Sequence, residues 1–253
     1  MRIEGFSITD RGMVRQYNED NCLANTQDGI FLVADGMGGL SKGDIASRIA
    51  VETVEGFIKR SRSEDITWPM KPQDQYSMEE NRFLAAVSMA NWNVFSEFMK
   101  GGGNEAMGTT VVGLLLDGDN AIITNVGDSR AYLVRNDTIE QLTDDHSLVM
   151  DEVRRGNMTV EEARNHPQKH VINRALGIAQ SVRVDISSRE IRQGDVFLLC
   201  SDGLSDMLSE DELLYAAQSN SAKPLEELGA QLINSANKKG GRDNISVVLV
   251  RCQ

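Results

Sequence analysis

Short runs of apolar and β-branched residues recur along the chain, and glycine, aspartate or asparagine bounds each run. Runs of this length between turn-forming residues are typical of buried β-strands. The segments 117–120 and 135–137 contain Asp-Gly and Asn-Asp pairs, which have the chemistry of hairpin turns, so neighbouring strands are expected to be largely antiparallel. Strands are predicted over residues 30–34, 110–116, 121–126, 131–134, 196–200 and 245–250.

Segments with helical spacing of apolar residues lie between these strands. In residues 41–59, Ile45, Ile49 and Val54 fall on one side, as in an amphipathic helix. Pro224 is placed to start the last helix, because proline is favoured in the first turn. Helices are predicted over residues 41–59, 81–100, 210–218 and 224–237. Long helices together with antiparallel strands predict an α+β fold with layers of both.

Two stretches follow neither pattern. Residues 61–78 are polar and contain Pro69 and Pro72, and we interpret them as a connection. Residues 154–176 mix charges with a Thr-x-x-Glu spacing from Thr159 to Glu162, which is typical of a helix capping box. We interpret this second stretch as a surface flap. Because no repeat, low-complexity tract or linker interrupts the chain, residues 1–253 are expected to form a single domain.

Composition narrows the classes of function. The chain has 253 residues, 40% of them hydrophobic, which is enough for a substantial core. Its net charge of −12, without a long basic run, argues against a surface for nucleic acid or an anionic membrane. No apolar stretch approaches the roughly 18 residues that span a bilayer, and the N-terminus lacks the apolar run of a secretory signal. A soluble, cytoplasmic protein is therefore expected.

The three cysteines do not suggest a covalent or zinc framework. Cys22, Cys200 and Cys252 are odd in number and have no paired spacing. Disulfide frameworks and zinc clusters need paired cysteines. These residues are expected to be reduced and structural.

Acidic residues stand where several apolar runs meet a turn that contains glycine or serine. A lone Asp-Gly pair is most often a turn or a helix cap, and overall acidity often reflects solvated surface charge. Repetition favours another interpretation, because carboxylates gathered at one edge of a sheet repel one another unless cations neutralise them. Metal binding is therefore predicted. The residues concerned are Glu19, Asp20, Asp35, Asp128, Asp202 and Asp243.

The residue types in these turns favour a hard cation. Of the histidines, only His146 lies close to an aspartate motif, and carboxylates with carbonyl oxygens suit Mg²⁺ or Mn²⁺ better than zinc or copper. Residues 117–120 do not match a calcium-binding EF-hand loop, and residues 38–43 do not match a nucleotide P-loop. The glycines after Asp35 are instead expected to let the carbonyl of Gly36 face a cation.

The same residues carry a resemblance to a known family. Each motif is weak alone, but together they run in family order along the whole chain. The motifs are Arg15-x-x-Asn18-Glu19-Asp20, Asp35-Gly36-Met37-Gly38-Gly39, Gly108-Thr109-Thr110, Gly127-Asp128-Ser129-Arg130, Leu142-Thr143-x-Asp145-His146-Ser147, Ser201-Asp202-Gly203 and Asp243-Asn244-Ile245-Ser246. The chain resembles the metal-dependent type 2C protein serine/threonine phosphatases, the PPM family, and looks most like its compact bacterial members.

The resemblance implies a four-layer α-β-β-α sandwich, in which two antiparallel sheets are flanked by helices. It also implies two Mn²⁺ or Mg²⁺ ions in a cleft at one end of the sheets. Asp35 would bridge these metals and orient the nucleophilic water, and the Gly36 carbonyl would ligate one of them. Asp202 and Asp243 would complete the other site, and Asp128 with Asp202 would hold a third ion.

The remaining motif residues are expected to support this centre. By resemblance, Glu19 and Asp20 would act in the outer shell through water, and Arg15 would bind the substrate phosphate. Arginine's planar fork makes two parallel contacts to phosphate, which lysine does not. The alternative for Arg15 is a surface salt bridge to Glu19. The implied protein is a monomer that hydrolyses phosphoserine and phosphothreonine in proteins and opposes a serine/threonine kinase.

One departure from many eukaryotic relatives is Met37, which stands where they have a histidine that could act as general acid. A thioether has no proton to donate, so another group must protonate the leaving alkoxide. His146 is expected to be a structural turn residue. Two alternatives stay open: a catalytically silent sensor or scaffold with this fold, and a hydrolase of small phosphoesters, because substrate choice lies in surface loops such as the flap.

Overall fold

The computed structural model describes residues 1–38, 42–100, 107–221 and 223–253. Gly39 of the glycine-rich motif and the predicted helix start at residue 41 lie outside these residues. The strands are β1 (Ile3–Asp10), β2 (Asp20–Asn25), β3 (Ile30–Gly38), β4 (Met107–Thr109), β5 (Val111–Asp117), β6 (Asn120–Val126), β7 (Arg130–Arg135), β8 (Thr138–Gln141), β9 (Asp185–Glu190), β10 (Val196–Cys200) and β11 (Ile245–Cys252). The helices are α1 (Lys42–Ser63), α2 (Met78–Lys100), α3 (Leu148–Arg154), α4 (Val160–Arg164), α5 (Asp202–Ser205), α6 (Glu210–Ser219) and α7 (Leu225–Lys238).

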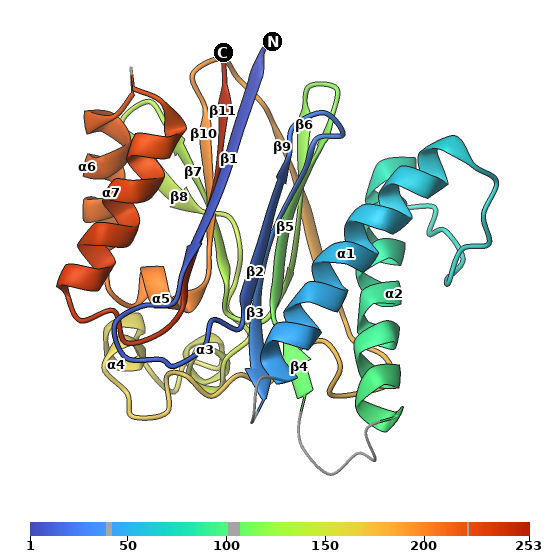
Figure 1. The fold of residues 1–253 in the computed structure, drawn as a ribbon, viewed down its shortest axis with the longest axis horizontal. Helices are drawn as coiled ribbons and strands as arrows, with labels where there is room; N and C mark the ends of the chain where they lie inside the picture. The colour runs from blue at the N-terminus through green and yellow to red at the C-terminus, as the bar shows by residue number, and fades with distance from the viewer. Residues whose placement is uncertain (39–41, 101–106, 222) are drawn as a thin grey trace.

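The strands form two sheets. One has the order β1-β11-β10-β7-β8, and the other has the order β2-β3-β5-β6-β9, with β4 paired to β3. All of these pairings are antiparallel. The two sheets stand face to face, α1 and α2 cover the outer side of one, and α6 and α7 cover the outer side of the other (Figure 1). The predicted four-layer sandwich is confirmed.

Three apolar cores hold the layers together. Phe31 and Phe197 belong to the core between the sheets, Phe57 lies in the core under α1 and α2, and Leu232 lies in the core under α7. All four side chains are almost fully buried, and burial of apolar area is the main favourable term in folding. The loops that carry the aspartate motifs are thus fixed to packed sheets.

The predicted strands and helices are all present within the described residues, and the local turn chemistry is confirmed. Asn136 and Asp137 both have positive φ, at 48° and 62°, as a two-residue hairpin turn with right-handed strand twist requires. Thr159 and Glu162 form both bonds of the predicted capping box at α4. No helix in the described ranges is long and apolar enough to cross a bilayer.

Five strands of the described residues lie outside the six predicted ranges: β1, β2, β4, β8 and β9. β1 contains Gly5 and is only half-buried along most of its length. β9 has the polar sequence Asp-Ile-Ser-Ser-Arg-Glu and lies at the edge of its sheet. Edge strands with one solvated face lack the continuous apolar run that marks a central strand. Their position depends on the neighbouring strands β11 and β6, which sequence pattern alone does not reveal.

Candidate active site

Asp20 and Asp35 lie opposite each other on the paired strands β2 and β3. The Asp20 carboxylate is buried: its Oδ2 accepts a hydrogen bond of 2.7 Å from Ser201 Oγ, and its Oδ1 has no partner among the described residues. Burial raises the pKa of Asp20 to about 7. Burial, and next the charge of Asp20, raises the pKa of Asp35 well above its ordinary value. This pair is unfavourable as two free anions.

Two more aspartates join the pair from the other sheet. Asp202 starts α5 directly after β10, and Asp243 lies just before the neighbouring strand β11. A side chain on Gly203 would overlap the Asn244 carbonyl oxygen, so glycine is needed where these two loops meet. Burial, and next the charge of Asp243, raises the pKa of Asp202 to about 6. Asp202 Oδ1 is buried without a partner in the described part of the chain.

Asp128 approaches the same place from the turn between β6 and β7. Burial, and next the charge of Asp202, raises its pKa to about 8. Asp128 and Asp202 both border a cavity of about 400 Å³ that extends between α4 and the residues from α5 to α6. The structure therefore brings Asp20, Asp35, Asp128, Asp202 and Asp243 close enough for their charges to interact.

Glu19 is tied to the backbone beside Asp35. Its Oε1 accepts a bond of 3.0 Å from the Gly43 amide, and its carbonyl oxygen accepts bonds from the Gly36 amide at 3.2 Å and from Ser47 Oγ at 2.6 Å. A side chain on Gly36 would overlap the Gly43 carbonyl oxygen. The close approach that only glycine allows places the Gly36 backbone next to Asp35 at the end of β3.

Arg15 reaches the carboxylate cluster from the loop between β1 and β2. Its Nη2 lies 2.6 Å from Asp243 Oδ2, and half of its side chain is exposed. The hydrogen bond to Asp243 raises the pKa of Arg15. The surface salt bridge to Glu19 that the sequence left open is not the one formed. A half-exposed guanidinium beside the aspartates is free to receive an anion on its open side.

Asn244 holds the Arg15 loop in place, a role that sequence reasoning missed. Its Nδ2 donates to the carbonyl oxygens of Arg11 and Tyr17, at 3.0 and 2.9 Å, and its Oδ1 accepts a bond of 2.8 Å from the Glu19 amide. One side chain thus bonds three backbone groups of that loop. The motif that contains Asn244 was recognised, but nothing local in the sequence shows what its amide contacts.

The Gly-Thr-Thr motif supports Asp35 through its backbone. Thr110 Oγ1 accepts a bond of 3.0 Å from the Asp35 amide, and both the Thr110 amide and Thr109 Oγ1 donate to the Asp35 carbonyl oxygen at 2.9 Å. The Thr110 hydroxyl also shares a bond of 2.7 Å with Ser129 Oγ, next to Asp128. The two threonines therefore connect the Asp35 strand to the Asp128 turn.

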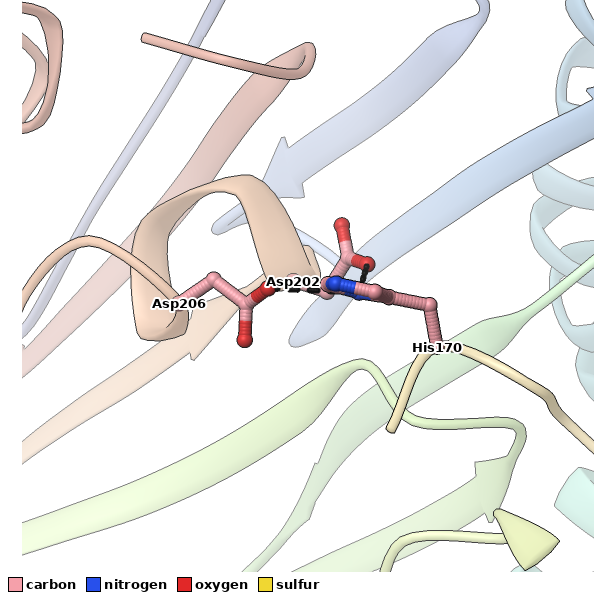
Figure 2. A group of neighbouring side chains, drawn as sticks. All are labelled: His170, Asp202 and Asp206. Atoms are coloured by element: carbon pink, nitrogen blue, oxygen red, sulfur yellow. Dashed lines mark ion pairs between the residues drawn. The ribbon is translucent and has the colours of Figure 1, made fainter. Parts of the chain in front are cut away.

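His170 is a second residue that the sequence analysis gave no role. Within the described ranges, one group of three potential metal-ligand atoms lies within 4.8 Å of one another, and it comprises His170, Asp202 and Asp206. Figure 2 shows the imidazole directed at both carboxylates; Nδ1 lies 3.3 Å from Asp206 Oδ2 and 3.9 Å from Asp202 Oδ2. Asp35, Asp202 and Asp243 do not form such a close group.

The family model described as protein phosphatase 2C matches residues 9–249. The chain belongs to this family. The resemblance to the type 2C phosphatases is confirmed, and so is the interpretation of the chain as a protein serine/threonine phosphatase.

Individual relatives agree with that assignment. The chain is 40% identical over 250 residues to the serine/threonine phosphatase stp of Listeria innocua, covering 96% of this chain and 93% of that protein. It is similar in structure to the serine/threonine phosphatase PstP/Ppp of Mycobacterium tuberculosis, with a TM-score of 0.86, 33% identity and 99% of each chain covered. A catalytic domain of PstP in complex with two manganese ions matches with a TM-score of 0.82 and 33% identity, over 98% of this chain and 97% of that one.

Proposed function

We propose that residues 1–253 act as one metal-dependent domain that hydrolyses phosphoserine and phosphothreonine in proteins and opposes a serine/threonine kinase. The observation that carries the metal dependence is the buried carboxylate cluster. Burial raises the pKa of Asp20 to about 7 and that of Asp128 to about 8. A stable site built from such groups needs protons or cations to neutralise it.

The residues fit divalent cations on a further ground. The buried Oδ1 atoms of Asp20 and Asp202 lack any hydrogen-bond partner among the described residues, and buried oxygens without partners are costly. Coordination of a cation would satisfy them. Oxygen donors favour Mg²⁺ or Mn²⁺, and the two manganese ions of the PstP structure support the same class of metal.

The proposed ligands are the Asp35 carboxylate, the Gly36 carbonyl, Asp202 and Asp243. When bound, the two cations would activate water as the nucleophile and offset charge on the phosphoryl group. Asp35 would hold the nucleophile in line with phosphorus, because its backbone is fixed by Thr110 at the end of β3. A third cation, if the cell supplies it, would lie with Asp128 and Asp202, which border the same cavity.

Two more residues of the chain would act in the outer shell. Asp20 lies opposite Asp35, and its Oδ1, for which the described part of the chain offers no hydrogen-bond partner, is suited to accept a bond from a metal-coordinated water. The Glu19 side chain is already engaged with the Gly43 amide, so it would hold the glycine-rich backbone rather than contact the substrate.

Arg15 would bind the phosphate. It is half-exposed, and its planar guanidinium presents several N–H donors that match phosphate oxygens. Its present bond to Asp243 keeps it aimed at the cluster. Because Met37 has no proton to give, the leaving serine or threonine alkoxide would take its proton from solvent or from another group at the site.

The test is release of phosphate from a phosphothreonine peptide with Mn²⁺, with Mg²⁺ and with EDTA. Asp202→Asn should abolish turnover in all three conditions, whereas Asp119→Asn, in the exposed hairpin between β5 and β6, is the matched control and should remain active. Activity that survives EDTA or Asp202→Asn would contradict the metal mechanism. Turnover of p-nitrophenyl phosphate without turnover of the peptide would indicate a hydrolase of small phosphoesters.

A further inference from the structure

The turn that presents Asp128 depends on the backbone of Gly127. Gly127 has φ of 113°, and a side chain there would come within 2.6 Å of the Thr110 side chain. Only glycine fits both the conformation and the space. Thr110 Oγ1 also accepts a hydrogen bond from the Asp35 amide. A displacement of Gly127 would therefore disturb the residues that support both Asp35 and Asp128.

His146 holds both backbone groups of this glycine. The Gly127 amide donates to His146 Nδ1 at 3.0 Å, and the His146 amide donates to the Gly127 carbonyl oxygen at 2.9 Å. The His146 side chain is 1% exposed, so it has no contact with the solvent of the cleft. The expectation that His146 is a structural turn residue agrees with this placement, and its contacts show which turn it holds.

These contacts fix the form of the imidazole. An amide N–H can only donate, so Nδ1 must carry no hydrogen, and burial lowers the pKa of His146 and favours the neutral ring. The hydrogen then sits on Nε2 and is donated to Asp185 Oδ2 at 3.1 Å. Arg174 Nη1 donates to Asp185 Oδ1 at 2.7 Å and also lies 3.0 Å from His146 Nε2, which cannot accept a bond from it while Nε2 carries the hydrogen. Asp185 thus keeps the hydrogen on Nε2, which leaves Nδ1 able to accept the hydrogen bond from the Gly127 amide.

We propose that His146 is a positioning residue, which sets the Asp128 carboxylate through the backbone of Gly127. This inference rests on the proposed function, because Asp128 matters only if the cluster binds metal. His146 touches neither substrate nor cluster. Its effect passes through the Gly127 amide, so the Nδ1 acceptor is the essential atom and the Nε2 contact to Asp185 is secondary.

Two substitutions separate the two ring nitrogens. In His146→Asn the amide oxygen occupies the place of Nδ1 and can still accept the Gly127 amide, but it cannot reach Asp185. In His146→Gln the terminal amide occupies the place of Nε2 and can still reach Asp185, but the Gly127 amide loses its acceptor. Both remove the aromatic ring, so loss of packing is common to the pair.

The expected result is that His146→Gln lowers kcat on p-nitrophenyl phosphate about tenfold and weakens Mn²⁺ binding, measured by calorimetry, by a similar factor. His146→Asn should stay within about threefold of wild type in both measurements. In an Asp128→Asn background, His146→Gln should change kcat by less than about twofold, because two changes acting through one group are not additive.

Equal losses of kcat and of Mn²⁺ affinity in the two variants would overturn the proposal and leave His146 as a packing residue. So would a tenfold loss of kcat from His146→Gln that persists in the Asp128→Asn background. If neither variant folds, the nitrogen chemical shifts of His146 in the intact wild type decide: Nδ1 without hydrogen supports the proposal, and Nδ1 with hydrogen refutes it. An inactive wild type that still binds Mn²⁺ would instead contradict the proposed function.

Discussion

Replacing Thr110 by valine tests how the Asp35 carboxylate is held. Valine has nearly the same shape as threonine, so the change removes the hydroxyl and little else. In the native protein that hydroxyl accepts the Asp35 amide at 3.0 Å and shares a bond of 2.7 Å with Ser129 Oγ. Thr110 is 2% exposed and Ser129 is fully buried, so water has little access to either group.

The magnitude follows from these two contacts. Leaving a buried donor or acceptor without its partner costs about 1–3 kcal/mol, so the loss of both contacts in Thr110→Val should lower the free energy of unfolding by roughly 2–6 kcal/mol. That is a large share of the stability of about 5–15 kcal/mol that is typical of a domain. Phosphatase activity with Mn²⁺ should fall by about 10- to 100-fold, as for other outer supports of a metal ligand.

Urea unfolding in EDTA measures the free energy of unfolding without any contribution from bound metal. Phosphopeptide turnover with Mn²⁺ measures the loss of activity. Thr110→Ser is the matched control: it keeps the hydroxyl and loses one buried methyl group, which costs about 1 kcal/mol. The serine variant should be the more stable and the more active of the two. A valine variant equal to or better than the serine variant in both assays would mean that the Thr110 hydroxyl does not hold Asp35.

Three further predictions use other parts of the chain. Burial raises the pKa of Asp20 to about 7 and that of Asp202 to about 6, above the ordinary 3.8. A raised folded-state pKa gives stability that is present at low pH and is lost as pH rises through that value. In EDTA, these two groups should therefore lower Tm as the pH rises from 5 to 8. Mn²⁺ should raise Tm more at pH 8 than at pH 5, and differential scanning calorimetry measures both effects. An equal rise in Tm at the two pH values would contradict Mn²⁺ binding by these carboxylates. Arg15→Ala should raise KM for the phosphopeptide about tenfold or more, through loss of charged hydrogen bonds of about 1.5–3 kcal/mol, with Arg15→Lys intermediate; steady-state kinetics showing an unchanged KM would exclude Arg15 from phosphate binding. Ser209→Ala removes the capping box of α6 and should lower stability in urea by about 1 kcal/mol without changing kcat; a lower kcat would mean that α6 contributes to the site.

The central strands and the list of acidic residues were predictable because each is a local feature. Residues 196–200 form a continuous apolar run and become the buried strand β10, and Asp202 follows one residue after that run. The polar edge strand β9 has no such signal. Its pairing with β6 makes it a strand, and tertiary contacts of this kind override weak local preference.

The supports of the site were less predictable, because they depend on residues far apart in sequence. The Asp20 to Asp35 pairing requires the register of β2 and β3, and His170 meets Asp206 only because the flap folds back over α5. Thr110 and Asn244 belong to recognised motifs, yet their partners Asp35 and Tyr17 follow only from the folded structure. Local motifs thus named the residues that the structure brings together, and the fold shows which groups Thr110 and Asn244 contact.

The most direct test of the central claim is to titrate Mn²⁺ into metal-stripped protein while following heat and phosphopeptide hydrolysis in parallel. Activity should be absent at the start and should appear as about two ions bind per chain, because the proposed hydrolytic site holds two dications. Asp243→Asn should abolish the activity and remove the binding heat of the ion that Asp202 and Asp243 would hold. Full activity in the stripped protein, or unchanged Mn²⁺ binding in Asp243→Asn, would contradict the assignment of this carboxylate cluster as the metal centre.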